Sequence, residues 1–147
     1  MERNEYIRKI SALCKLVRTE ASLSQDKMAQ ILGISKKSLV ETEKGRRLLS
    51  FCEAIALSSV FSHSTILQNE FGGELSDMIQ ALAFAKQNVR YPKTMGGRIW
   101  WTDLREKNGY RIQQNILSKH YRILDPNDGR MMSSFDCDQI EDYFAKL

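Results

Sequence analysis

Residues 24–45 read SQDKMAQILGISKKSLVETEKG, and this stretch decides the fold of the first half of the chain. Ser24 is a favourable N-cap, and the helix that it begins stops at Gly33, a residue that tolerates the left-handed conformation of a helix C-cap. Ser35 then caps a second short helix, which ends just before Gly45. The sequence therefore predicts two short helices joined by a tight turn.

Helical patterns continue on both sides of this pair. Apolar residues recur at helical spacing over residues 4–19 and predict an amphipathic helix there. After the pair, Ser50 and Glu53 form a capping box for an apolar helix, and another helix covers about residues 64–71. Together these helices predict a compact, five-helix, all-α domain over residues 1–73.

The remainder of the chain has a different pattern. A sixth helix and a connector are expected over residues 74–97, and residues 138–147 predict a last helix. Residues 103–107 fit either a strand or one helical turn. Short runs rich in β-branched and aromatic residues, separated by turn signals, predict strands. These runs are Ile99–Thr102, Tyr110–Gln113, His120–Leu124 and Met131–Phe135.

The expected fold class is therefore α+β. The five-helix domain is followed by a small unit over residues 98–147, in which an antiparallel sheet is joined by a helix. We expect this second unit to serve in oligomerisation or sensing.

Composition narrows the function without deciding it. The chain has 147 residues, of which 42% are hydrophobic and 27% charged, as in ordinary globular proteins, and this length excludes a large multi-layer enzyme. The net charge of +4 suits a polyanionic partner but is common among other proteins too. No apolar run approaches the ~20 residues that span a bilayer, so no membrane partner is expected.

The cysteines and histidines do not form a metal-binding pattern. Cys14, Cys52 and Cys137 lie far apart, and no Cys-x-x-Cys occurs. Neither a structural metal nor a disulfide framework is expected, which favours the reducing cytoplasm as the compartment. We expect the three thiols to be buried as small hydrophobic groups.

A resemblance rests on residues 18–47, which run from RTEASLSQ through MAQILGIS to KKSLVETEKGRR. This segment resembles the helix-turn-helix of the phage-repressor and Cro class, the Xre-like bacterial regulators, and the resemblance covers about residues 6–72. Ala29 is small where two helices cross, Gly33 permits the sharp turn, and Leu39 buries the inner side of the second helix. In this family the second helix lies in the DNA major groove.

The resemblance implies which residues read bases. It places Lys36 and Lys37 at the start of the second helix, and helical spacing puts Val40 and Glu41 on the same outer face. Lysine can donate to guanine, valine can contact a thymine methyl group, and glutamate can accept from cytosine. Lys37 and Glu41 also have the spacing of an ordinary surface ion pair. The predicted base-reading residues are Lys36, Lys37, Val40 and Glu41.

Phosphate contacts are expected beside this face. Ser24 and Gln25 stand at a helix N-terminus, where free backbone N–H groups suit an anion, and the resemblance implies that Gln25 contacts the DNA backbone. Basic residues also follow the second helix. The predicted phosphate-contacting residues are Ser24, Gln25, Ser38, Lys44, Arg46 and Arg47.

The resemblance further implies an ion pair inside the protein. Arg18 and Glu43 match the positions of an arginine and a glutamate that pair in well-known family members, and the pair would orient the first and third helices. The chain departs from the family at Thr42, where an apolar residue is commoner.

Two adjacent tryptophans are the main clue in the second half. Neighbouring residues of a strand point to opposite faces, so Trp100 and Trp101 cannot both enter one core from a single-layered sheet. Covering by two flanking helices, a dimer interface and a ligand pocket all stay open. The dimer-interface candidates are Trp100, Trp101, Tyr143 and Phe144.

These patterns predict a cytoplasmic, sequence-specific regulator of transcription. We expect a repressor that binds double-stranded DNA at a palindromic operator as a homodimer, without a metal or cofactor. An unidentified protein or small molecule stays open as an effector. The alternative is a protein-interaction module, such as a DNA-binding antitoxin that neutralises a partner through its C-terminal half. No residues converge on a catalytic mechanism, so no enzyme activity is expected.

Overall fold

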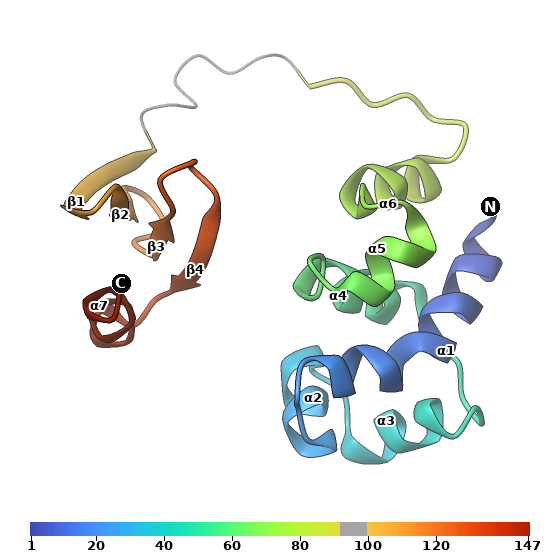
Figure 1. The fold of residues 1–147 in the computed structure, drawn as a ribbon. Coiled ribbons are helices and arrows are strands. Elements are labelled where there is room, and N and C mark those ends of the chain that lie inside the picture. The colour runs from blue at the N-terminus through green and yellow to red at the C-terminus, as the bar shows by residue number, and fades with distance from the viewer. Residues whose placement is uncertain (92–99) are drawn as a thin grey trace. The chain divides into compact units, whose positions relative to one another are not determined.

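The computed structural model describes residues 1–91 and 100–147 (Figure 1). Its contacts divide the chain into two compact units, Met1–Arg90 and Tyr91–Leu147. The first unit is all-helical and the second combines an antiparallel sheet with one helix, which confirms the predicted α+β class. Residues 92–97 of the predicted connector, and Ile99 of the first strand-like run, lie outside the described residues.

Serine N-caps begin four of the six helices in the first unit. Ser24, Ser35, Ser50 and Ser64 each accept a hydrogen bond from the backbone N–H three residues later, which satisfies a donor that the helix itself leaves free. Glu53 completes the predicted capping box at Ser50. The helices are α1 (Arg3–Glu20), α2 (Gln25–Leu32), α3 (Lys36–Glu43), α4 (Phe51–Val60), α5 (Thr65–Phe71) and α6 (Leu75–Phe84).

The core of the first unit forms around one stripe of α1. Tyr6, Ile10, Cys14 and Val17 follow each other every three or four residues and are fully buried. Burying a large apolar side chain contributes about 1.5–3 kcal/mol, so this stripe is a main source of stability. The Tyr6 hydroxyl donates to the backbone oxygen of Ala54 at 3.0 Å, which satisfies its polar end inside the core.

Helix α6 belongs to the same core. Leu75 is buried, and Met78, Ile79 and Leu82 pack against the core cluster from the same helix. The helix contacts both α4 and α5. The first unit therefore extends past residue 73 to Arg90.

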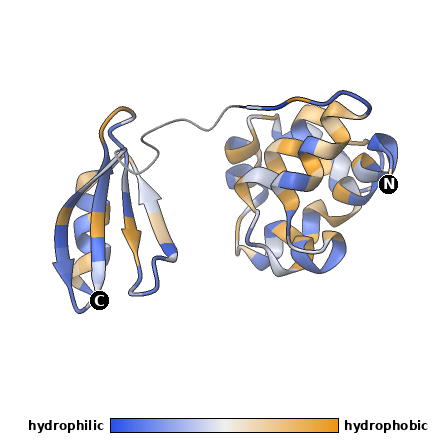
Figure 2. Cartoon of the chain, turned by 90° about the horizontal axis from the view of Figure 1, so that it is seen from above, coloured by the Kyte–Doolittle hydropathy of each residue, from blue (hydrophilic) through white to orange (hydrophobic). Residues whose placement is uncertain are grey.

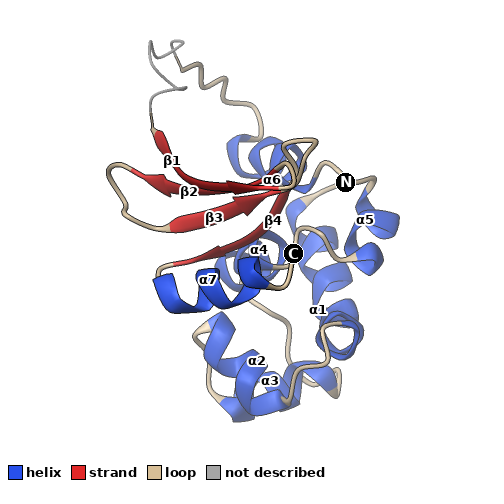
Figure 3. Cartoon of the chain, turned by 60° about the vertical axis from the view of Figure 1, so that its left-hand side comes forward, coloured by secondary structure: helices blue, strands red, loops and turns tan. Residues whose placement is uncertain are grey.

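The second unit is an antiparallel sheet in which each strand pairs with the next along the chain (Figure 3). A helix follows the last strand and begins at Asp136, whose side chain accepts hydrogen bonds from the backbone N–H groups of Asp138 and Gln139. The elements are β1 (Trp101–Lys107), β2 (Tyr110–Asn115), β3 (Tyr121–Leu124), β4 (Arg130–Ser134) and α7 (Cys137–Ala145).

Alternation along the strands places one face of the sheet against α7, and the strands in Figure 2 change between hydrophilic and hydrophobic colours. Ile112 of β2 lies opposite Ile123 of β3, and both join Ile140 and Phe144 of α7 in a small core. Residues 103–107, which fitted either a strand or a helical turn, belong to β1. Pairing with β2 decides this, because each ladder hydrogen bond depends on the neighbouring strand.

The prediction of three buried thiols is wrong for two of them. Cys14 is buried, and loss of water raises the pKa of its thiol to about 11, with the Glu43 carboxylate adding to the shift and Arg18 opposing it. Cys52 and Cys137 are exposed, because each lies in the first turn of a helix away from that helix's buried residues. Among the helices of the described ranges, none is long and apolar enough to cross a membrane.

Candidate nucleic-acid interface

The turn between α2 and α3 has the conformation that its sequence predicts. Gly33 has φ +70° at the C-cap of α2, a left-handed conformation that costs a residue with a Cβ about 1–2 kcal/mol. The backbone N–H of Ile34 donates to the carbonyl of Ala29 at 3.1 Å, which closes the end of the helix. Ala29 is buried, and α2 packs on α3. The two helices therefore form a tight helix-turn-helix.

The inner and outer faces of α3 are clearly separated. Leu39 and Thr42 are buried, whereas Lys36 and Lys37 are exposed at the start of the helix. Val40, on the predicted outer face, is half-buried. The four base-reading candidates therefore retain access to solvent, and the two lysines are the most accessible.

Charged neighbours distinguish the lysines of this face. Lys36 Nζ lies 3.2 Å from a carboxylate oxygen of Asp26, near the start of α2. No acidic side chain of residues 1–91 lies within ion-pair distance of Lys37. Glu41 lies 3.8 Å from Arg46, so the ion pair with Lys37 that its spacing allowed is not formed.

Glu43 connects three helices of the first unit. Arg18 Nε donates to one of its carboxylate oxygens at 2.5 Å, and the side chains of the pair are only 13% and 4% exposed. Arg18 also donates to the carbonyl of Leu23, and the Gln25 amide donates to the second oxygen of Glu43 at 2.8 Å. The carboxylate therefore joins α1, the start of α2 and the end of α3.

The contact with Glu43 occupies part of the hydrogen-bonding capacity of Gln25. Its amide nitrogen has two hydrogens, and one is directed at the carboxylate. The Ser24 hydroxyl accepts from the backbone N–H of Lys27, and the Ser38 hydroxyl contacts Ser35. The Ser24 hydroxyl therefore caps α2, and the Ser38 hydroxyl is engaged by the N-cap of α3.

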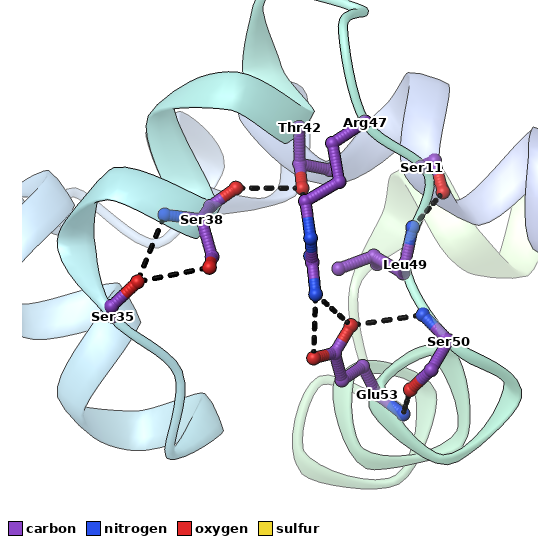
Figure 4. A network of polar contacts seen from close by, with 8 residues as sticks. All are labelled: Ser11, Ser35, Ser38, Thr42, Arg47, Leu49, Ser50 and Glu53. Carbon is purple, nitrogen blue, oxygen red and sulfur yellow. Dashed lines mark hydrogen bonds and ion pairs between the residues drawn. The ribbon is translucent and has the colours of Figure 1, made fainter.

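Arg47 is half-buried, and its guanidinium is engaged by neighbouring side chains of the protein (Figure 4). Its Nη2 donates to both carboxylate oxygens of Glu53, at 2.9 and 3.0 Å, and its Nη1 donates to the Thr42 hydroxyl at 3.3 Å. Burial raises the pKa of Glu53, but hydrogen bonds from Arg47 and from the Ser50 backbone outweigh it and hold the pKa below its usual value. Of the predicted phosphate contacts, Ser24, Lys44 and Arg46 are exposed.

This network explains the unusual Thr42. Its hydroxyl donates to the carbonyl of Ser38 at 2.9 Å and accepts from Arg47, so its polar group is satisfied at a position where the resemblance favours an apolar residue. Sequence reasoning missed the role of Glu53 in this network. The capping box assigned Glu53 to the end of α4, and nothing in the sequence brings it to Arg47.

A shallow cleft lies beside the end of α3, and sequence reasoning missed one of its residues. Arg8 on α1 lines this cleft together with Ser11, Lys44 and Gly45. The polar face of an amphipathic helix gives no signal of which neighbour it will meet, so Arg8 could not be selected from its pattern. The cleft adds a cation from α1 to the basic segment that follows α3.

The dimer-interface candidates of the second unit occupy different environments. Trp100 precedes β1 and is exposed, and Trp101 is half-buried, so neither belongs to the core cluster. Tyr143 is exposed on α7. Phe144 is 5% exposed and packs in the core against the sheet, so its assignment to a surface is wrong. Adjacent residues of a helix point about 100° apart, and Phe144 shares the buried stripe of Ile140 four residues earlier, whereas Tyr143 lies outside it.

Of the three alternatives for the tryptophans, covering by two flanking helices does not occur within the described residues of the second unit. Of residues 100–147, only α7 forms a helix, and it packs against β3 and β4. In the same described ranges, no group of three or more histidine, cysteine or acidic side chains is placed to hold a metal ion.

Comparison with known proteins supports the helix-turn-helix. The chain is 32% identical over 89 residues to a protein of Thermococcus kodakarensis whose name describes it as an HTH-type transcriptional regulatory protein. The match covers 60% of this chain but only 26% of that relative. No family model matches the chain, and no solved structure matches it.

Proposed function

We propose that this chain is a sequence-specific DNA-binding regulator of transcription, an Xre-like repressor that acts in the cytoplasm and binds a palindromic operator as a dimer. The observation that carries the proposal is the exposed face of α3, which begins with Lys36 and Lys37 directly after a tight glycine turn. The likeness to an HTH-type regulatory protein supports the same function.

In this proposal α3 lies in the major groove with its first turn at the base edges. Lys37 donates to guanine O6 and N7, and Lys36 does the same after leaving Asp26, an exchange that costs little because exposed ion pairs contribute about 0–1 kcal/mol. Val40 and Glu41 face the bases one turn later and contribute a methyl contact and an acceptor.

Phosphates on either side would position the helix. Lys44 and Arg46 follow α3, Arg8 lies at the adjoining cleft, and the free backbone N–H groups of α2 point away from its start. The Glu43 pairs keep α2 and α3 at a constant angle, so these groups would be in place before DNA arrives.

The test begins with selection of binding sites from random DNA by the purified full chain, for which we expect a palindromic consensus. Lys36→Ala and Lys37→Ala should each then lose ~1–3 kcal/mol of discrimination between that consensus and random DNA. Arg46→Ala should weaken both DNAs alike and lower the slope of log affinity against log salt by ~0.9.

Lys15→Ala is the matched control, because Lys15 is an exposed lysine on α1 outside the proposed interface. It should leave discrimination unchanged. Equal losses on consensus and random DNA for Lys36→Ala and Lys37→Ala would contradict the assignment of base reading to α3.

A further inference from the structure

One face of the second unit's sheet has no covering layer among residues 100–147. Helix α7 packs on the face that holds Ile112 and Ile123. Strand alternation directs Gln113 and Arg122, which lie opposite each other in β2 and β3, to the other face. We call this second face, formed by Trp101, Asp103, Glu106, Arg111, Gln113, His120, Arg122, Arg130 and Phe135, the open sheet face.

An aromatic row crosses one end of the open sheet face. Trp101 of β1 and the His120 ring, just before β3, meet edge to face with ring centroids 4.9 Å apart. The Phe135 ring, just after β4, follows at 5.6 Å from His120. Phe135 is 76% exposed although it continues this row. Trp101 and His120 are half-buried, so Phe135 is the exposed member of the row, and aromatic side chains are enriched at the centre of protein–protein interfaces.

The row beside it is polar and held in one arrangement. The Arg122 guanidinium lies 3.7 Å from the centre of the Trp101 ring, and its Nε donates to Gln113 at 2.8 Å. Gln113 in turn donates to Asp103 at 2.6 Å. These contacts order side chains that a binding event would otherwise have to immobilise, which lowers the entropic cost of association.

The charged residues of the open sheet face distinguish a nucleic-acid partner from a protein partner. The open sheet face carries Asp103 and Glu106 together with Arg111, Arg122 and Arg130, and Arg111 is paired with Asp128. A nucleic acid requires an excess of positive charge, which this mixture of both signs does not supply. A second copy of the same face carries both signs, and in a two-fold contact an acid of one copy that meets an arginine of the other forms that pair twice.

We propose that two copies of the chain associate through their open sheet faces, with Phe135 and Trp101 as the apolar centre and the charged residues around them. The proposal rests on the dimer of the proposed function and names its surface. Sheets commonly pack face to face in this way, with side chains of the two inner faces interdigitated.

The first experiment measures self-association of the full chain by analytical ultracentrifugation. Phe135→Ser removes an exposed ring that lies outside both cores, so the units should stay folded by circular dichroism. The dimer dissociation constant should rise ~tenfold or more, because every substitution occurs twice across a two-fold interface. Val60→Ser is the control, an exposed apolar residue at the end of α4 in the first unit, and should leave the constant unchanged.

The second experiment uses charge. Glu106→Lys makes the open sheet face more positive and Arg130→Glu makes it more negative, and both side chains are exposed. Each variant should self-associate more weakly than the unchanged chain, and an equimolar mixture should associate more tightly than either variant alone. Heterodimers in that mixture bring opposite charges together, which a merely destabilised unit would not reproduce.

The outcomes separate this proposal from DNA recognition. A Phe135→Ser chain that dimerises as tightly as the unchanged chain, a chain that is monomeric throughout, or a mixture no better than its components overturns the open sheet face as the contact. Base discrimination by Lys36 and Lys37 is measured on DNA carrying a single half-site, which one copy can occupy. It therefore succeeds or fails independently of self-association.

Discussion

Glu43 contacts residues that lie far from it in the sequence. Its two carboxylate oxygens accept from Arg18 and Gln25, and its side chain is 4% exposed. A charge in that position must be compensated, because water cannot reach it. The arrangement of α2 and α3 therefore depends on a buried residue that lies off the exposed face of α3.

Removing one partner of this pair should be costly. We expect Arg18→Met to lower the free energy of unfolding by ~3–5 kcal/mol, because it leaves the Glu43 carboxylate buried without its cation. Urea denaturation measures the change. Lys9→Met is the control, since Lys9 pairs with Glu5 and Glu70 at the surface and should cost only ~0–1 kcal/mol. Similar losses of unfolding free energy for the two variants would show that the buried pair contributes no more to stability than the exposed one.

Two consecutive arginines should behave differently. Arg47→Ala leaves Glu53 and Thr42 without their donor, so we expect a loss of ~1–3 kcal/mol in unfolding free energy. Arg46 is exposed and only loosely paired with Glu41, so Arg46→Ala should change stability by less than ~0.5 kcal/mol. Thermal and urea unfolding of both variants test this contrast. Equal stability of the two would place Arg47 in solvent, against the network of Figure 4.

At the scale of elements, the joint between α2 and α3 depends on one backbone conformation. Gly33 has φ +70°, and no atom lies within 4 Å of the position that a Cβ would take. Substitution there is therefore limited by the backbone and not by space. The stability cost of a substitution at residue 33 therefore depends on how readily the new residue adopts the left-handed conformation.

We expect Gly33→Ala to cost ~1–2 kcal/mol of unfolding free energy, because alanine disfavours the left-handed region. Gly33→Asn should cost less, since asparagine enters that region more readily. Chemical denaturation of the two variants gives the comparison. A smaller loss for alanine than for asparagine would mean that the turn changes conformation in the variants.

At the scale of the whole molecule, the chain consists of two units with separate cores. Helix α6 completes the core of the first unit, because its Leu75 is buried among the residues of the preceding helices. Each unit therefore has the apolar core that independent folding requires.

A chain of residues 1–90 should fold alone, stay monomeric and bind operator DNA more weakly than the full chain. A chain of residues 1–72 should melt at a lower temperature than residues 1–90, because it loses the apolar side chains that α6 adds to the core. Calorimetry on the two fragments measures the difference. Identical melting temperatures would mean that α6 contributes nothing to the first unit.

The sequence by itself determined the features that depend on neighbouring residues. Serine N-caps, the glycine at residue 33 and the apolar spacing of α1 are local signals, so the helix-turn-helix and the α+β class could be predicted. The exposed lysines of α3 followed from the same periodicity.

Only the tertiary structure decided which distant groups meet. Arg47 and Arg46 look equivalent in sequence, but Glu53 holds one and leaves the other in solvent. Residues 103–107 form a strand because their backbone pairs with β2. Phe144 is part of the core because the sheet packs against its side of α7. Local preference is a fraction of a kcal/mol per residue, so long-range pairing and burial outweigh it wherever they act.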